Sequence, residues 1–221
     1  MKYKLVIFDF DGTLADSFQF FLKTVNELAD IYHFRKVDIE DIETLRRYDA
    51  KRVISYLGVP LWKAPIVGNS FKLKMAEKID QVPLFPGVEN MLRDLNRSGI
   101  LLSLITSNSY DNVSRILNPN TMALMTYPQC GVSLFGKRPR LRHILRKTGI
   151  HPSEVIYIGD EIRDLEAARA ENVDFGAVSW GYTRIDALIE HSPAEIFYSV
   201  EEISKKLARE HGMEEASKDG S

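Results

Sequence analysis

Cysteine is almost absent from this chain of 221 residues, since Cys130 is the only one. A single cysteine excludes an intrachain disulfide and argues against a zinc site built from thiolates. We therefore expect a reducing, cytoplasmic setting, with Cys130 as a small packing residue. The five histidines show no ligand spacing, so a histidine metal site is not predicted either.

Long hydrophobic runs and an excess of charge of one sign are also missing. The first apolar run, Leu5-Val6-Ile7-Phe8, stops at Asp9 and is too short for a signal peptide or a membrane span. The 29 basic and 31 acidic residues leave a formal net charge of -2, which gives no global field to attract nucleic acid or an anionic membrane. We expect neither as a partner, and the sequence does not predict the oligomeric state.

The chain does contain short apolar runs that alternate with helical patterns. Strands are predicted over residues 4–8, 100–105, 155–158, 173–178 and 195–198. Helical periodicity is present over residues 88–97, 141–147, 161–171 and about 200–211. This alternation predicts βαβ units and an α/β fold, in which a parallel sheet is covered by helices on both faces.

The region from about residue 18 to residue 82 differs, because it has helical periodicity and no convincing strand. We interpret it as an all-helical domain inserted after the first strand. The predicted division is an α/β core over residues 1–16 and 83–212, a helical insertion over 17–82, and a polar tail over 213–221 that we expect to be disordered.

Polar side chains close the predicted strands. In an open parallel sheet, ligands bind outside the carboxyl ends of the strands, so these side chains are the candidates for function. They are Asp9 and Asp11, Thr106 and Ser107, and Asp160 with Asp164. Lys137 lies outside the strands, in a Gly-Lys-Arg-Pro segment just before a predicted helix. Such an inventory suits a site that holds a divalent cation and a phosphoryl group together.

The acidic residues predict metal-assisted phosphoryl transfer. Mg²⁺ prefers oxygen ligands and few carboxylates, which Asp9, Asp160 and the backbone carbonyl of Asp11 would supply. The metal would offset the repulsion between Asp9 and a phosphate, so that Asp9 can attack phosphorus and become an aspartyl phosphate. Asp11 is placed to give a proton to the leaving oxygen and later to take one from water.

The remaining candidates are predicted to bind phosphate. The Thr106 hydroxyl and the Ser107 backbone N–H would bond the phosphoryl oxygens, and Lys137 would offset their charge. Gly12 would allow a turn that points successive N–H groups at the phosphate.

Four segments in this order resemble the motifs of the haloacid dehalogenase superfamily: Asp9-Phe10-Asp11-Gly12-Thr13-Leu14, Thr106, Lys137, and Gly159-Asp160-Glu161-Ile162-Arg163-Asp164. The resemblance covers roughly residues 4–178. It implies a Rossmann-like core and a mobile cap of the helical type found in phosphoglycolate phosphatases and β-phosphoglucomutases. It also implies roles, namely nucleophile for Asp9, acid/base for Asp11, phosphate-binding hydroxyl for Thr106, charge-balancing lysine for Lys137 and metal ligand for Asp160. Asp164 matches a second acidic position, where a supporting role and direct ligation both stay open.

Several residues also have simpler interpretations. Asp164 can serve only the N-terminus of a helix, Thr106 can be an N-cap or an ordinary strand residue, and Lys137 can be a surface lysine. Arg138 competes with Lys137, because the proline of that motif follows only after Arg138. We interpret the basic cluster of the cap as a solvated helix face, with contact to an anionic substrate as the alternative; it comprises Arg46, Arg47, Lys51 and Arg52.

The predicted activity is Mg²⁺-dependent hydrolysis of a small phosphomonoester, with 2-phosphoglycolate as one candidate. A phosphomutase of the β-phosphoglucomutase type and a catalytically silent binding module are the alternatives. A dehalogenase is disfavoured, because displacing halide needs no acid such as Asp11. Intact Asp9, Asp11, Lys137 and Asp160 argue against a silent module.

Overall fold

The computed structural model of the chain describes residues 2–60, 62–133 and 136–208. Five parallel strands form one sheet in the order β2-β1-β3-β4-β5. Their bounds are β1 (Leu5–Phe8), β2 (Leu101–Leu104), β3 (Val155–Gly159), β4 (Asp174–Val178) and β5 (Glu195–Phe197). The predicted α/β fold is confirmed, and each strand lies within two residues of its predicted bounds. The predicted tail over 213–221 and the end of the last predicted helix lie outside the described residues.

Helices connect the strands and build the inserted segment. They are α1 (Phe18–Tyr32), α2 (Ile42–Leu45), α3 (Ala50–Tyr56), α4 (Ala64–Glu77), α5 (Val88–Arg97), α6 (Tyr110–Met122), α7 (Lys137–Thr148), α8 (Ile162–Arg169), α9 (Ile185–Ile189) and α10 (Val200–Ala208). Short 3-10 turns are η1 (Ile39–Asp41), η2 (Ile79–Gln81) and η3 (Pro152–Glu154). None of the described helices is long and apolar enough to cross a membrane.

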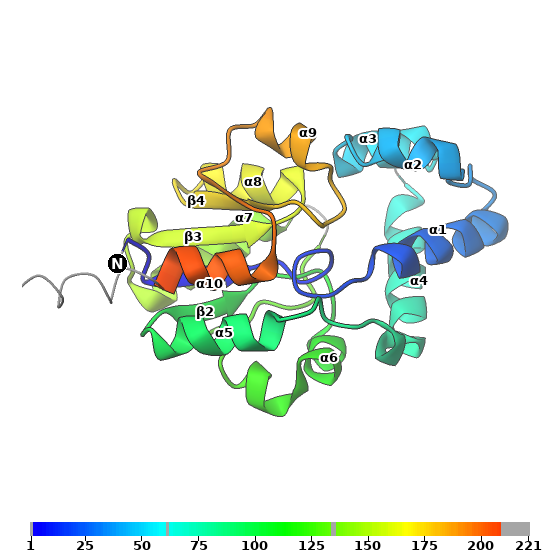
Figure 1. Cartoon of the computed structure of the whole chain (residues 1–221). Helices are drawn as coiled ribbons and strands as arrows, with labels where there is room; N and C mark the ends of the chain where they lie inside the picture. The colour runs from blue at the N-terminus through cyan, green and yellow to red at the C-terminus, as the bar shows by residue number, and fades with distance from the viewer. Residues whose placement is uncertain (1, 61, 134–135, 209–221) are drawn as a thin grey trace, which may run out of the picture.

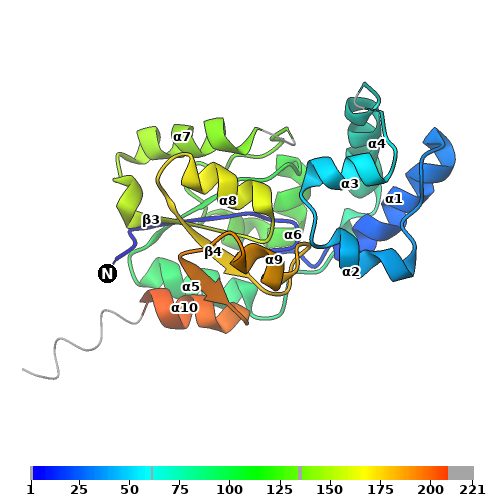
Figure 2. The ribbon, with the colours of Figure 1, turned by 90° about the horizontal axis from the view of Figure 1, so that it is seen from above.

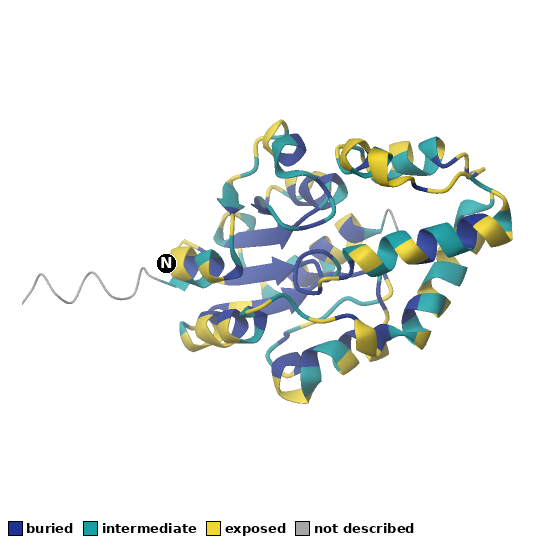
Figure 3. Ribbon diagram, turned by 45° about the vertical axis from the view of Figure 1, so that its right-hand side comes forward, coloured by how far each residue is buried: buried dark blue, intermediate teal, exposed yellow. Residues whose placement is uncertain are grey.

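The sheet separates two hydrophobic layers. In β1, Val6 and Phe8 pack in the layer that includes residues of α5, α6 and α10, while Leu5 and Ile7 pack in the layer that includes residues of α7 and α8. Figure 2 shows α7 and α8 on one side of the sheet and α5 and α10 on the other. Because both faces are covered, the central strands β1 and β3 are continuously apolar instead of alternating, and Figure 3 shows the sheet as the buried centre of the molecule.

The helices α1 to α4 form a group of their own beyond the carboxyl ends of the strands (Figure 1). This segment, residues 18–81, is called the cap below. It has a separate small core that includes Val25, Leu45 and Leu57, and α1 packs along α4. The described residues of this segment, 18–60 and 62–81, contain no strand, in agreement with the sequence, while the domain boundaries at residues 17 and 82 stay predictions.

Two segments differ from the sequence-based expectation. The helix predicted over 141–147 begins four residues earlier, at Lys137, because Pro139 falls in the first turn, where its missing N–H costs no helical hydrogen bond. The irregular stretch after Ser109 contains a helix, α6, which is kinked where Asn118 takes a positive φ of 56° before Pro119. Beyond α6, Met125 and Gln129 make isolated bridges to the β2 edge of the sheet.

Candidate active site

Asp9 stands where β1, the strand between β2 and β3, ends. Its backbone N–H donates to the carbonyl of Ile158 at 2.9 Å, which continues the pairing of β1 with β3 by one residue. The side chain is 3% exposed, and its Oδ2 lies 2.7 Å from the ammonium of Lys137. A carboxylate is therefore held at the end of a buried strand by one charged partner.

Lys137 is the first residue of α7 and is as buried as Asp9. Its ammonium forms ion pairs with both Asp9 and Asp164, so the alternative of a surface lysine is wrong. Arg138 instead donates to Glu171 at 2.6 Å, on the outside of the molecule. Of the two basic residues, the structure therefore brings Lys137 to the strand ends, and Arg138 lies outside the site.

Asp164 holds the cluster together from the first turn of α8. Its Oδ1 accepts from Lys137 and, at 3.1 Å, from the hydroxyl of Tyr157. Its Oδ2 accepts from the backbone N–H of Glu161 at 3.3 Å, as part of a capping box for α8. Both oxygens have protein partners, so Asp164 fixes the Lys137 ammonium and the start of α8 at the same time.

Asp160 is fully buried between two glycine-containing loops. Its Oδ1 accepts from the Thr13 hydroxyl and its Oδ2 from the Tyr182 backbone N–H, both at 2.7 Å. A Cβ added at Gly181 would come within 2.6 Å of Asp160 Cγ, so the loop approaches closely only because this residue has no side chain.

Gly12 lies in a turn that packs closely against Asp160 and the Tyr182 ring. Its φ of +78° suits glycine, and a Cβ there would collide with Asp160 and come within 2.6 Å of the Tyr182 ring. The N–H of Gly12 donates to Ala15 at 2.9 Å and that of Thr13 to Phe10 at 3.2 Å. These two N–H groups are thus engaged inside the turn, and the phosphate-binding role of Gly12 stays a prediction.

Asp11 lies at the mouth of the site and is half-buried. Asn108 Nδ2 lies 3.4 Å from its Oδ2, while no described group hydrogen-bonds to the covered Oδ1. Burial raises the pKa of Asp11, against the opposing effect of the Ser17 hydroxyl and of Lys137. A carboxyl group in this setting is suited to carry a proton.

Thr106 and Ser107 follow β2 at the same edge of the sheet. Thr106 is fully buried, and its Oγ1 accepts from the Asn108 backbone N–H at 3.0 Å, while Ser107 is half-buried. The Asn108 side chain is itself fixed, because its Oδ1 accepts from Asn112 Nδ2 at 2.8 Å and from the Ser109 N–H. Asn108 is a site residue to which the sequence assigned no role.

The site carries an excess of negative charge that a bound cation would neutralise. Carboxylate oxygens of Asp9, Asp160 and Asp164 all lie within 4.8 Å of one another, with one lysine among them. Burial raises the pKa of Asp9, which Lys137 opposes, and it raises the pKa of Asp160, to which Glu161 and Asp9 add. Since the donors are oxygens and negative charge is in excess, the residues fit a hard divalent ion such as Mg²⁺.

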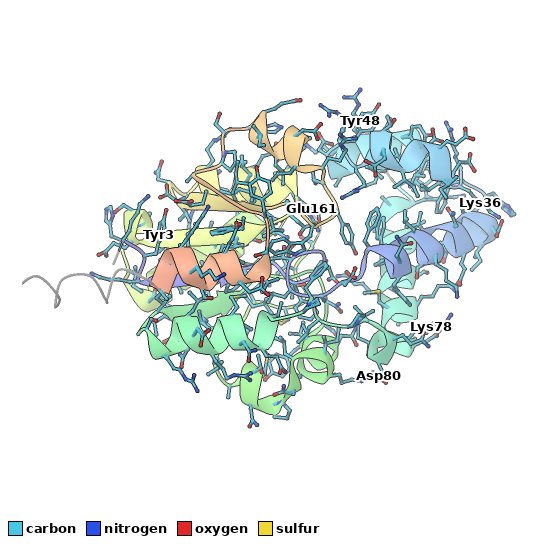
Figure 4. All side chains as sticks on the ribbon, in the orientation of Figure 1. Tyr3, Lys36, Tyr48, Lys78, Asp80 and Glu161 are labelled. Atoms are coloured by element: carbon cyan, nitrogen blue, oxygen red, sulfur yellow. The ribbon has the colours of Figure 1, made fainter. Side chains whose placement is uncertain are left out.

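The groups that hold Asp160 were only partly visible in the sequence. Thr13 belongs to the first motif, and its hydroxyl is a side-chain donor that could have been predicted to bond to Asp160. Tyr182 had none, because it acts on Asp160 through its backbone N–H. Glu161, which pairs with Arg163, lies on the side of the core that faces the cap (Figure 4).

The chain is similar in sequence to known enzymes. Residues 6–178 match the profile of the haloacid dehalogenase-like hydrolases. Phosphoglycolate phosphatase of Synechococcus elongatus is 30% identical over 85% of this chain and 89% of its own length. Phosphoglycolate phosphatase of Xylella fastidiosa (strain Temecula1) is 28% identical over 81% of each chain.

Solved structures share the fold. A protein from Clostridium acetobutylicum described as a predicted phosphatase superposes with a TM-score of 0.78 at 23% identity, over 94% of this chain and 99% of its own. A haloacid dehalogenase-like family protein from Streptococcus pneumoniae superposes with a TM-score of 0.75 at 18% identity, over 93% and 98%. At these identities the likeness shows the fold alone.

Proposed function

We propose that this chain, which belongs to the haloacid dehalogenase-like hydrolase family and is a phosphatase, hydrolyses a small phosphomonoester with Asp9 as the nucleophile and with the help of Mg²⁺. The observation that carries the proposal is the buried cluster at the sheet edge. Asp9, Lys137 and the Asp160/Asp164 pair come from three separate segments. Lys137 pairs with Asp9 and Asp164, and carboxylate oxygens of all three acids lie within 4.8 Å of one another.

Two carboxylates divide the reaction between them. A carboxylate oxygen of Asp9 attacks phosphorus, the ester P–O bond breaks, and Asp11 gives its proton to the departing alkoxide. Water then attacks the aspartyl phosphate while Asp11 takes up a proton, which releases inorganic phosphate and restores Asp9. The raised pKa of Asp11 favours its protonated form, in keeping with the first of these steps.

Asp9 and Asp160 would hold the metal, together with the backbone carbonyl of Asp11. When bound, Mg²⁺ supplies positive charge that neutralises the nucleophile and the phosphoryl oxygens. Lys137 ties Asp9 to Asp164, so the nucleophile keeps one orientation before substrate arrives. Thr106 remains the proposed hydroxyl donor to a phosphoryl oxygen.

The proposed substrate is a small phosphorylated metabolite, with 2-phosphoglycolate as the first candidate. The support is the sequence similarity to two phosphoglycolate phosphatases over more than four fifths of this chain. A screen of phosphorylated metabolites under steady-state conditions ranks the candidates by kcat/KM.

The mechanism is tested by Asp9→Asn, which keeps the shape of the side chain and removes its nucleophilic oxygen. Phosphate release from an aryl phosphate should fall to background, and acid-quenched wild-type protein should carry the mass of one phosphoryl group on Asp9. Asp30→Asn is the matched control, since Asp30 is an exposed cap residue paired with Lys36. Turnover that survives in Asp9→Asn, or that persists in EDTA, would contradict the proposal.

A further inference from the structure

The loop between β4 and α9, residues 179–184, contacts the Asp160 carboxylate and the cap at once. On the core side, the Tyr182 N–H donates to Asp160 Oδ2 at 2.7 Å and the Thr183 N–H to the Asp160 carbonyl at 3.3 Å. The close approach of Gly181 leaves no free space between the loop and this side chain. The orientation of Asp160 therefore depends on where the loop lies.

On the cap side, Arg46 at the end of α2 binds the same loop. Its Nη2 donates to the Gly181 carbonyl at 2.9 Å and its Nε to the Tyr182 carbonyl at 3.1 Å. The backbone takes part too, because the Arg184 N–H donates to the Arg46 carbonyl at 2.8 Å. Figures 1 and 2 both show α2 beside this loop and α9.

One peptide unit joins these contacts. The carbonyl of Gly181 and the N–H of Tyr182 belong to the same planar group, so the position of one atom sets the position of the other. Arg46 holds the carbonyl end and Asp160 accepts from the N–H end. A charge-assisted bond at the carbonyl also polarises the N–H and strengthens its bond to Asp160.

The Tyr182 side chain anchors the loop against the beginning of the cap. Its hydroxyl lies 2.9 Å from Ser17 Oγ, and its ring packs against Phe18 and Phe21 of α1 at centroid distances of 5.3 and 5.1 Å. Rotation of the cap about the Ser17 connection would thus disturb both ends of the loop. Such a movement would break the contacts that the loop makes with Arg46 and with α1.

These contacts also change the interpretation of Arg46. The expectation of a solvated helix face is wrong for this residue, since its side chain is 23% exposed and binds the core. The alternative of a direct substrate contact gains no support, because its third nitrogen, Nη1, pairs with Glu43 at 3.1 Å. All three guanidinium nitrogens have partners within the protein.

We propose that Arg46 is a positioning residue for the metal site, so that docking of the cap and the affinity for the divalent ion are linked through the Gly181–Tyr182 peptide. The inference rests on the metal site of the proposed function. Linkage is reciprocal, so a docked cap favours metal binding and bound metal favours the docked cap to the same degree.

Metal binding without substrate tests this directly. Mn²⁺ is titrated into the full chain and free Mn²⁺ is followed by electron paramagnetic resonance, for wild type, Arg46→Met, Arg46→Lys and Arg52→Met. Arg52 is the matched control, because it is an exposed cap arginine whose guanidinium lies over the Tyr48 ring, 3.8 Å from the centroid. Circular dichroism of each variant checks that it is folded.

The direction of the change in Mn²⁺ affinity distinguishes a positioning role of Arg46 from a simple effect of its charge. Removing a positive charge near a cation site should by itself tighten Mn²⁺ binding, and Arg52→Met controls for the loss of a cap arginine that packs on Tyr48 instead of the loop. If Arg46 positions Asp160, Arg46→Met weakens binding by about fivefold or more, and Arg46→Lys weakens it as well, because an ammonium cannot reproduce the two-point contact. Equal or tighter binding in both Arg46 variants would overturn the inference.

Two further measurements keep the inference separate from the metal site itself. Asp160→Asn should lose most of the Mn²⁺ affinity; if it binds like wild type, the proposed metal site is wrong, not only the linkage. Hydrogen exchange then reads the reciprocal effect: Mg²⁺ should slow exchange of the Tyr182 and Arg184 amides in wild type and fail to do so in Arg46→Met. Unchanged exchange in wild type that binds metal would also overturn the linkage.

Discussion

Ion pairs are buried inside the core and exposed where the cap meets the core. In the core, the side chains of Asp9, Lys137 and Asp164 pair while they are 3% exposed or less. Where the cap meets the core, Arg47 pairs with Asp186 and Glu190, and these side chains are 39% to 66% exposed. Burying charge is costly and is rarely the most stable choice, whereas exposed pairs cost little and contribute little. The buried cluster is therefore better explained by the proposed chemistry than by a gain in stability, while the exposed pairs help to orient the two surfaces.

The largest effect is expected for Lys137→Met, which leaves two buried carboxylates without their partner. The free energy of unfolding should fall by about 3–5 kcal/mol in urea titrations, and phosphatase activity should be lost. Arg138→Met, one residue along the chain, removes an exposed arginine with a partner of its own and should leave activity unchanged. Comparable losses in the two variants would show that the buried and exposed positions do not differ as argued.

The next effect compares one glycine from each region. Gly12 and Gly58 both have positive φ, of 78° and 66°, but only Gly12 has neighbours that an added Cβ would strike. Gly58→Ala should cost about 1 kcal/mol of stability from backbone strain and leave activity intact. Gly12→Ala should cost more and also lower activity and metal affinity, because it displaces Asp160. If both variants lost the same stability in thermal unfolding, the close approach of Gly12 to Asp160 would be unimportant.

A smaller effect is expected for Arg47→Met at the exposed contact between cap and core. The loss of stability should be less than half of that caused by Gly58→Ala, and it should vanish in 1 M salt, which screens exposed pairs. Urea midpoints at low and high salt measure both parts. A loss of stability that persists in 1 M salt would show that salt does not screen this contact, as expected for a buried pair.

The smallest effect lies within the cap, where Lys74 bonds to Glu27 at 2.8 Å. That bond is the main reason why the pKa of Glu27 is lowered from 4.5. A lowered pKa in the folded state means that the stabilisation is complete above pH 4.5 and is lost as the pH falls through the folded value. The stability difference between wild type and Lys74→Met should therefore shrink from pH 7 to pH 3.5. A constant difference would assign the effect to packing of the lysine stem.

The features that the sequence predicted well are those with a local cause. The helix α5 has its predicted bounds, residues 88–97, because its apolar spacing and Gly99 are both local signals. The nearness of Asp9 and Asp160 was also predictable, from the general rule that strand ends meet at one edge of a parallel sheet; their roles stay predictions.

The features that were missed depend on contacts distant in sequence. Tyr182 holds Asp160 through a backbone N–H, and Arg46 meets carbonyl groups 135 and 136 positions away. No side-chain pattern records a backbone partner, so neither contact can be read from composition or periodicity. The charge of Arg46 led to the prediction that its side chain is solvated, whereas it donates to main-chain oxygens of the core.

The strand order has a consequence for how the protein is made. β1 is the first strand to be synthesised, yet it lies between β2 and β3, so its two partners begin only at residues 101 and 155. At roughly 5–20 residues per second, the apolar segment Leu5–Phe8 waits on the order of 10 s for its second neighbour. During that time the whole cap is translated. We therefore expect this apolar segment to stay exposed until both neighbours are translated, so that aggregation during synthesis depends on the speed of translation through the cap.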